Sequence, residues 1–190
     1  ADSELNCSIE CQGDLLISNS IIHGYSWVDD NIYTHHNFLD PAILFSSAAK
    51  SKLIITDSTV TSNTQEGYRN VVIEYANNSE ISLNKSTFIG GTYFAGYGSY
   101  LEGHIDGSDC ISIKNCQDII VNIDGCTFEG GEGNRAKAQR IPMLEGGGKG
   151  GDGLAIQNST VKLHFDLNPS TFKGNNGGDG YVVARKLLQE

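Results

Sequence analysis

Several features that are common in proteins are scarce in this sequence. It has only three prolines and one methionine, and no apolar run approaches the roughly 18 residues that a membrane-spanning helix needs. Basic residues are also few, since 13 Lys and Arg stand against 23 Asp and Glu, for a formal charge of −10. We therefore expect no membrane span and no nucleic-acid partner, because binding a polyanion requires an excess of positive charge.

A helical apolar period is missing as well. No window of adequate length repeats apolar residues every 3.6 positions, which argues against long helices. Glycine, in contrast, is abundant with 23 residues, and the hydrophobic content is a modest 38%. This balance favours many short strands joined by turns. A chain of 190 residues is long enough for one continuous core, so we expect a single domain over residues 1–190.

The strongest pattern is an internal repeat of three short runs. Its centre is a tripeptide with a small first residue and an apolar last residue, found at Ser20-Ile21-Ile22, Ser58-Thr59-Val60, Ser86-Thr87-Phe88, Cys126-Thr127-Phe128 and Ser170-Thr171-Phe172. A β-rich run precedes each centre, at Leu15-Leu16-Ile17, Leu53-Ile54-Ile55, Ile81-Ser82-Leu83, Ile119-Ile120-Val121 and Val161-Lys162-Leu163. Another follows after a loop of varying length, at Ile43-Leu44-Phe45, Val71-Val72-Ile73, Ile111-Ser112-Ile113, Leu154-Ala155-Ile156 and Tyr181-Val182-Val183.

Strands this short cannot bury a face alone, but coiling lets each one pair in parallel with its counterpart one unit later. The repeat therefore predicts an all-β fold, a right-handed parallel β-helix (a solenoid) of about five coils. Each coil has three short strands, and the long loops leave one corner. The last residue of each tripeptide is expected to stack inward and the middle one to point outward. An antiparallel sandwich also has many short strands, but it does not predict the same tripeptide in every unit.

One family resemblance appears near the end of the chain. Phe172-Lys173-Gly174-Asn175, followed by Gly177-Gly178, resembles the β-helix repeats of polymorphic outer-membrane and adhesin proteins, which carry Phe-x-x-Asn before a glycine-rich turn. Phe128-Glu129-Gly130-Gly131 fits that pattern loosely, and the first two units do not fit it. The resemblance in fold extends over nearly the whole chain, whereas the motif is specific in the last third. It implies a surface or extracellular role and supplies no active site.

Cysteines and glycosylation motifs point the same way. The five cysteines are compatible with an oxidising compartment, although the odd count leaves at least one thiol without an intramolecular partner. Cys7 and Cys11 are close enough in sequence to form a disulfide. The chain starts as a mature secreted form would, at Ala1-Asp2-Ser3. Four Asn-x-Ser/Thr sequons predict N-glycosylation, at Asn6, Asn77, Asn84 and Asn158. We therefore expect a secreted or cell-surface glycoprotein.

Candidate chemical sites are sparse. Gly151-Asp152-Gly153 and Gly178-Asp179-Gly180 precede two equivalent strands, and calcium binding there is the alternative to a simple turn. One acid per turn favours the turn, so we expect no cofactor and no metal. The five histidines lack the spacing of a zinc site.

Enzymes that cleave polysaccharides share this fold and use paired carboxylates. The loop acids that could form such a pair are Asp29, Asp30, Asp40, Asp106 and Asp109. We expect no catalytic residues, with a polysaccharide lyase or glycoside hydrolase as the alternative.

The long loops are rich in aromatic residues. If the units stack, these loops leave the same corner on successive coils and build one aromatic flank. Aromatic side chains with a polar tip anchor protein interfaces and sugar contacts, and the alternative is that the loops merely pack on one another. The residues that would form this flank are Tyr25, Trp27, Tyr33, Phe38, Tyr68, Tyr93, Phe94, Tyr97 and Tyr100.

The two ends of a solenoid expose strand edges, which other β-helices cover with a cap. Residues 1–14 are expected to form a small N-terminal cap and residues 184–190 a C-terminal tail. The run from Tyr181 to Leu188 is apolar with only two charges, and no convincing cap follows it. The chain is therefore either a segment of a longer solenoid or a protomer that stacks on another copy, with an axial repeat of about 24 Å for five coils. We expect an extracellular structural protein of a surface fibre, appendage or adhesin. The alternative is a carbohydrate-binding or carbohydrate-cleaving β-helix.

Overall fold

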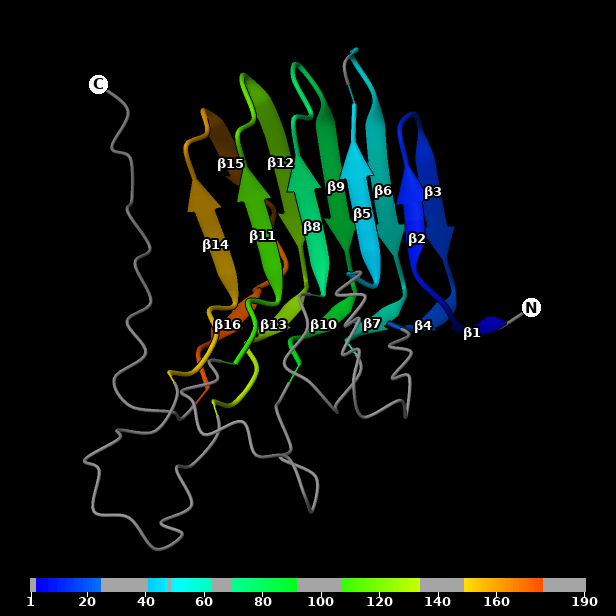
Figure 1. The fold of residues 1–190 in the computed structure, drawn as a ribbon, viewed down its shortest axis with the longest axis vertical. Helices are drawn as coiled ribbons and strands as arrows, with labels where there is room; N and C mark the ends of the chain where they lie inside the picture. Colours follow the sequence, from blue (N-terminus) through cyan, green and yellow to red (C-terminus); the bar gives the residue numbers. More distant parts are fainter. Residues whose placement is uncertain are drawn as a thin grey trace, which may run out of the picture.

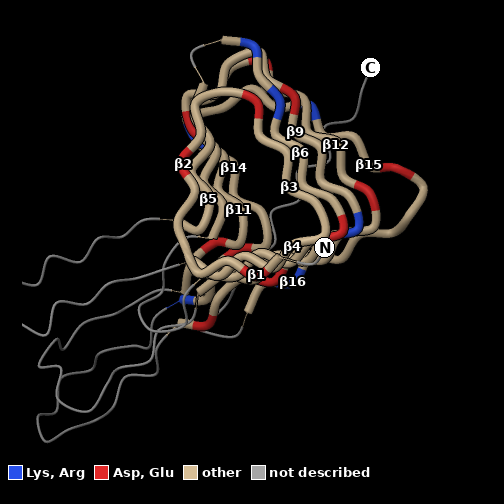
Figure 2. The backbone as a smooth tube through the Cα atoms, turned by 90° about the vertical axis from the view of Figure 1, so that its right-hand side faces the viewer, with Lys and Arg blue, Asp and Glu red and all other residues tan. Residues whose placement is uncertain are grey.

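The protein is built from three parallel sheets that form the walls of a solenoid (Figure 1). The computed structural model describes residues 3–24, 41–47, 49–62, 70–91, 107–133 and 149–175, and it is all-β within these ranges. Figure 2 looks along the stack, and the chain passes from wall to wall around a common interior. The right-handed parallel β-helix predicted from the repeat is therefore confirmed. In this part of the chain no helix is long and apolar enough to cross a membrane.

Each wall takes every third strand, and each strand pairs in parallel with its counterpart one coil away. Sheet A contains, in order, β1 (Ser3–Asn6), β4 (Ser20–His23), β7 (Thr59–Thr61), β10 (Thr87–Ile89), β13 (Thr127–Glu129) and β16 (Thr171–Lys173). Sheet B contains β2 (Ile9–Cys11), β5 (Ile43–Ser46), β8 (Val71–Glu74), β11 (Ile111–Lys114) and β14 (Leu154–Gln157). Sheet C contains β3 (Leu15–Ser18), β6 (Lys52–Thr56), β9 (Glu80–Asn84), β12 (Ile119–Asp124) and β15 (Val161–Phe165).

The register of sheet A follows the repeated tripeptide. Its last residues stack as one inward column, Ile22 on Val60, Val60 on Phe88, Phe88 on Phe128 and Phe128 on Phe172. The Phe88 and Phe128 rings lie parallel with their centroids 5.3 Å apart, and those of Phe128 and Phe172 are 4.6 Å apart. Offset stacking of this kind adds to the free energy gained by burying the rings. The middle residues form an outward column in which Thr59, Thr87, Thr127 and Thr171 are direct neighbours.

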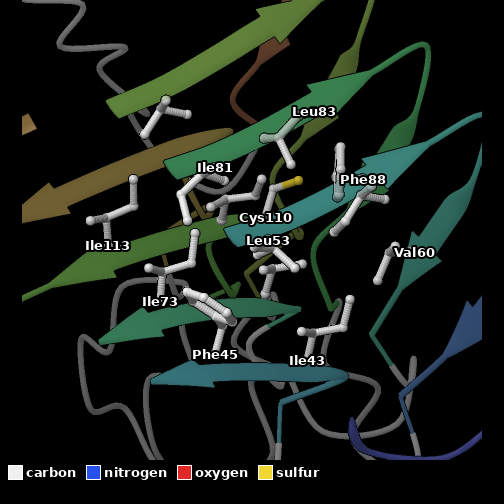
Figure 3. Close-up of a cluster of buried hydrophobic side chains, with 14 of the residues drawn as sticks. Ile43, Phe45, Leu53, Val60, Ile73, Ile81, Leu83, Phe88, Cys110 and Ile113 are labelled. Atoms are coloured by element: carbon white, nitrogen blue, oxygen red, sulfur yellow. The ribbon is translucent and has the colours of Figure 1, made fainter. Parts of the chain in front are cut away.

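The interior between the walls is filled by aliphatic and phenylalanine side chains. Figure 3 shows side chains of sheets A, B and C meeting there, among them Phe45, Leu83 and Phe88. These three are almost completely buried. Inward and outward residues alternate along β6 and β9, as a strand with one buried face requires. Burial of these apolar side chains contributes about 25 cal/mol for each Å² of apolar surface removed from water, and it is the main contribution to the stability of the solenoid.

The corner between sheets C and A is held by the small residue that begins each tripeptide. The hydroxyl of Ser58 accepts the Ser20 N–H at 3.2 Å and donates to the Thr56 carbonyl at 2.7 Å. The hydroxyl of Ser86 accepts the Ser58 N–H at 3.1 Å in the same way. These bonds satisfy backbone groups that a sharp corner removes from the strand ladder. The residue before each corner Ser or Cys has a left-handed φ of 46° to 60° in four coils, at Asn19, Asp57, Lys85 and Gly125.

The first turn of the solenoid differs from expectation. Residues 3–11, expected to belong to a small cap, contain β1 and β2, which pair with β4 and β5 and extend the sheets. In the register of sheet A the tripeptide of β1 is Ser3-Glu4-Leu5, which has the small first and the apolar last residue of the repeat but a charged middle residue. All four residues of β1 are exposed. The expected strand at Tyr181-Val182-Val183 and the tail at 184–190 lie outside the described residues.

Replacing Phe128 by alanine is expected to lower the free energy of unfolding by about 3–5 kcal/mol. The ring is fully buried between two other rings, so its loss leaves a cavity that the stacked backbone cannot close. Urea unfolding followed by circular dichroism measures this change. The matched control is Thr127→Val, one residue earlier and exposed, which is expected to change stability by no more than about 0.5 kcal/mol. Equal effects of the two substitutions would contradict the assignment of inward and outward columns.

Candidate functional site

The aromatic residues predicted to form a flank all fall in the long connections between sheets A and B. Tyr25, Trp27, Tyr33, Phe38, Tyr68, Tyr93, Phe94, Tyr97 and Tyr100 lie outside the described residues. The structure does describe the residues from which these connections leave and to which they return. Each long connection joins a strand of sheet A to the next strand of sheet B, so that all of them start at one corner.

Backbone hydrogen bonds tie the bases of two successive loops together at this corner. Ser108, which follows the loop after β10, donates its N–H to the Gly91 carbonyl at 3.1 Å. Its own carbonyl accepts the Gly131 N–H at 2.9 Å. The Gly131 carbonyl in turn accepts the Gly151 N–H at 2.8 Å. The start and the end of each loop therefore alternate in one ladder, which we call the glycine ladder (Gly91, Ser108, Gly131 and Gly151).

The ladder is too tight for a side chain at Gly131 or Gly151. A Cβ atom on Gly131 would lie 1.9 Å from the Gly91 carbonyl oxygen, and one on Gly151 would lie 2.0 Å from that of Ser108. Gly107 and Gly130 are equally constrained, since their Cβ atoms would meet carbonyl oxygens at 2.0 and 1.9 Å. Because the obstacle is backbone in every case, it cannot move without opening the coil. This contact, rather than conformational freedom, explains the glycines around residues 90, 107, 130 and 151.

Two aspartates are neighbours beside the glycine ladder. Asp109 and Asp152 each stand two residues before a paired position of sheet B, Ile111 and Leu154. The Asp152 N–H donates to Oδ1 of Asp109 at 3.1 Å. Burial, and then the charge of Asp109, raise the pKa of the Asp152 carboxyl above its ordinary value. The corner therefore holds one carboxylate next to an acid that keeps its proton to a higher pH, the combination from which acid–base pairs are built.

Asp152 and Asp109 were singled out from the sequence separately, as a turn residue and as a loop acid. Aligning the two third runs would have placed them at the same offset before a strand. The other candidate acids, Asp29, Asp30, Asp40 and Asp106, and the second turn at Gly178-Asp179-Gly180 lie outside the described residues. Within the ranges that the structure covers, no three His, Cys, Asp or Glu side chains come together as a metal site.

The cysteines fall into a buried group and a half-buried pair. Cys110, Cys116 and Cys126 are buried free thiols, and burial raises the pKa of each. Cys126 stands in the corner column of serines and donates to the Asp124 carbonyl at 3.4 Å, two residues back, as those serines do. The expected disulfide between Cys7 and Cys11 is not formed, and both are free thiols. The extended strand β2 (Ile9–Cys11) carries the chain away from Cys7, at about 3.3 Å per residue.

The predicted glycosylation sites differ in exposure. Asn6, at the end of β1, and Asn158, at a corner after β14, are exposed. Asn77 and Asn84 are half-buried, and Oδ1 of Asn77 accepts the Gln117 N–H at 2.9 Å. A folded chain therefore has room for a glycan at Asn6 and Asn158, whereas the half-buried side chains of Asn77 and Asn84 are less accessible.

The two end coils leave strand edges without a partner among the described strands. These edges belong to β1, β2 and β3 in the first coil and to β14, β15 and β16 in the last. Core positions are also opened there: Leu5 is 42% exposed and Ile156 is 43% exposed, whereas equivalent residues in the middle coils are completely buried. Phe165 and Leu167 of the last coil are 57% and 101% exposed. Open strand edges with apolar side chains are the usual starting point for association between chains.

Replacing Gly131 by alanine is expected to lower the free energy of unfolding by about 1–3 kcal/mol, because the new methyl group would overlap the Gly91 carbonyl. Gly13 offers a matched control, since a Cβ atom there would meet nothing within 4 Å. Urea unfolding of Gly131→Ala and Gly13→Ala compares the two. A Gly131→Ala variant as stable as the Gly13→Ala variant would show that the glycine ladder is not tightly closed.

Replacing Asp152 by asparagine is expected to raise the unfolding midpoint at pH 7 by up to about 2 °C. The folded state raises the pKa of Asp152, so its ionisation costs stability once the pH is above that value. Below the ordinary value of 3.8 the carboxyl is protonated in both states and the cost is absent. The difference between the two proteins should therefore disappear between pH 7 and pH 3.5, as followed by thermal unfolding. A wild-type protein more stable than the variant at pH 7 would contradict this assignment.

Comparison with known proteins adds no relative to this geometry: no family model matches the chain, and no match is found among curated proteins or solved structures.

Proposed function

We propose that the protein is an extracellular structural module, a protomer or segment of a surface fibre, appendage or adhesin. In this role the solenoid serves as a scaffold that associates through its end coils and presents the long loops from one corner. The observation that carries the proposal is the state of the two ends. Three strand edges at each end have no partner among the described strands, and core positions such as Leu5 and Ile156 are open to solvent.

The energetics of a solenoid support association at these ends. A further coil in register would pair the free N–H and C=O groups of three edge strands and cover the exposed core side chains. Both gains repeat what every middle coil already achieves, so no new kind of contact is needed. A head-to-tail contact of this type joins two different surfaces, and it propagates into a filament when it does not close into a ring.

An extracellular location fits the distribution of the sequons. Asn6 and Asn158 are exposed and lie on strand or corner residues of the first and last coils. The expected glycans would then sit close to the proposed contacts and would modulate the association.

A second candidate is a carbohydrate-binding or carbohydrate-cleaving protein, and the pair Asp109 and Asp152 favours it. The two acids lie at the base of the loop corner, and burial and the charge of Asp109 move the pKa of Asp152 in the direction that favours a general acid. The pair would act there as proton donor and base, and both Asp109→Asn and Asp152→Asn would abolish cleavage.

The purified 190-residue chain is expected to form threads at micromolar concentration, measured by multi-angle light scattering and negative-stain microscopy. The axial repeat should be about 29 Å, from six strands of sheet A at about 4.8 Å each, and not the 24 Å expected from five coils. Compact monomers at every concentration would contradict the fibre proposal. Release of reducing sugars or unsaturated products from a polysaccharide by such monomers would establish the second candidate.

A further inference from the structure

Sheet A is the wall in which a head-to-tail contact would begin. It contains both the first strand, β1, and the last strand, β16, of the described solenoid. The register along the sheet makes Leu5 of β1 and Phe172 of β16 members of the same inward column. Glu4 shares its outward column with Thr171, and Asn6 shares its column with Lys173. If β16 of one copy paired with β1 of the next, these three pairs would become direct neighbours.

The apolar members of this contact are both incompletely covered. Phe172 stacks on Phe128 on the inner side of the coil, with 4.6 Å between the ring centroids. Its other ring neighbour is Phe165, which meets it edge-on at 6.0 Å. Leu5 is 42% exposed at the opposite end of the column. A second copy would place Leu5 about 4.8 Å from Phe172 and continue the column without a break.

The edge strands at the two ends have opposite charge. The strands of the first coil carry Glu4 and Glu10 and no basic residue. Those of the last coil carry Lys162, Lys173 and His164 and no acid. This difference favours head-to-tail contacts over contacts between like ends, because like charges in opposed strands repel.

A single ion pair would set the register. In the parallel arrangement Glu4 lies on the same face as Lys173, one strand away and two residues along it, at about 8 Å between Cα atoms. Both side chains are long enough to meet over that distance, and both are solvent-exposed, at 66% for Glu4 and 58% for Lys173. Within the chain, Lys173 Nζ lies 2.6 Å from Glu129, its direct neighbour on the preceding coil, and Glu4 Oε1 lies 3.5 Å from Nε2 of His23. In the proposed contact both side chains would gain an additional partner of opposite charge.

We propose that the partner of the last coil is a second copy of this chain, bound head to tail through sheet A. In this contact β16 pairs in parallel with the partner's β1, Phe172 packs on Leu5, and Lys173 binds Glu4. The inference rests on the proposed structural function. It specifies the direction of association, the register of the paired strands and the charged pair between them. The chain runs through the sheets in the order A, B, C, so the contact is proposed for sheet A alone, where β16 and β1 are the two end strands.

Charge reversal tests the contact without depending on loss of function alone. In a sample of one single variant, Lys173→Glu or Glu4→Lys, residues 4 and 173 carry the same charge at every contact. The repulsion between them should raise the concentration needed for assembly by about tenfold or more. A 1:1 mixture of the two variants restores opposite charges at every contact, so it should assemble as the wild type does. The double variant Glu4→Lys/Lys173→Glu should assemble as well. Light scattering and sedimentation follow all four samples, and circular dichroism checks folding.

Lys52→Glu is the matched control, because Lys52 binds Glu80 at 3.1 Å within sheet C and is away from the proposed contact. It should leave the assembly threshold unchanged. Should charge reversal unfold a variant, Lys173→Gln and Glu4→Gln replace it, and each should remove most of the salt dependence of assembly.

The possible failures are distinguishable. A wild-type chain that stays monomeric would overturn the proposed function. Single variants that assemble normally, or a mixture of folded variants that fails to recover, would overturn the sheet A contact and leave self-association standing.

Discussion

Parallel pairing between equivalent residues of successive coils is the interaction on which the rest of this structure depends. The strands are three to six residues long, so none is stable alone. Each obtains its backbone hydrogen bonds from the coils on either side, and each inward side chain packs mainly on its counterpart one coil away. A position in one coil therefore constrains the same position in the next, which is why Phe88, Phe128 and Phe172 form a column.

The same constraint explains how the corners are built. Where the chain turns from sheet C to sheet A, a left-handed residue and a serine or cysteine replace the backbone bonds that the turn removes. Where it turns from sheet A to sheet B, glycines at the loop bases pack backbone against backbone. Because this ladder closes the bases, loops of very different length can leave the corner without disturbing the register behind them. Variation in the loops is thereby separated from the stability of the scaffold.

At the two ends of the described solenoid the strands lack a neighbouring coil on one side, and the functional proposals follow from this. Leu5 at one end and Phe172 at the other belong to one column that stops at each end of the described chain. The first and last strands carry opposite charges, which is why we propose that these two ends bind each other. The acid pair Asp109 and Asp152 depends on stacking in another way, since two residues 43 positions apart become neighbours only because β11 and β14 are paired.

The sequence by itself determined the coil architecture. The tripeptide ending in Ile22, Val60, Phe88, Phe128 and Phe172 was enough to predict three strands per coil, the inward column and loops on one corner, because a repeated local pattern reports directly on repeated local structure. It missed β1 and β2, because the tripeptide Ser3-Glu4-Leu5 of β1 has a charged middle residue and β2 is only three residues long. Only the tertiary structure decided that Cys7 and Cys11 stay apart, that Asp109 meets Asp152, and that the glycines at residues 107, 130, 131 and 151 interlock. These are contacts between neighbouring coils or consequences of strand direction, and they depend on distances across the stack that no single stretch of sequence contains.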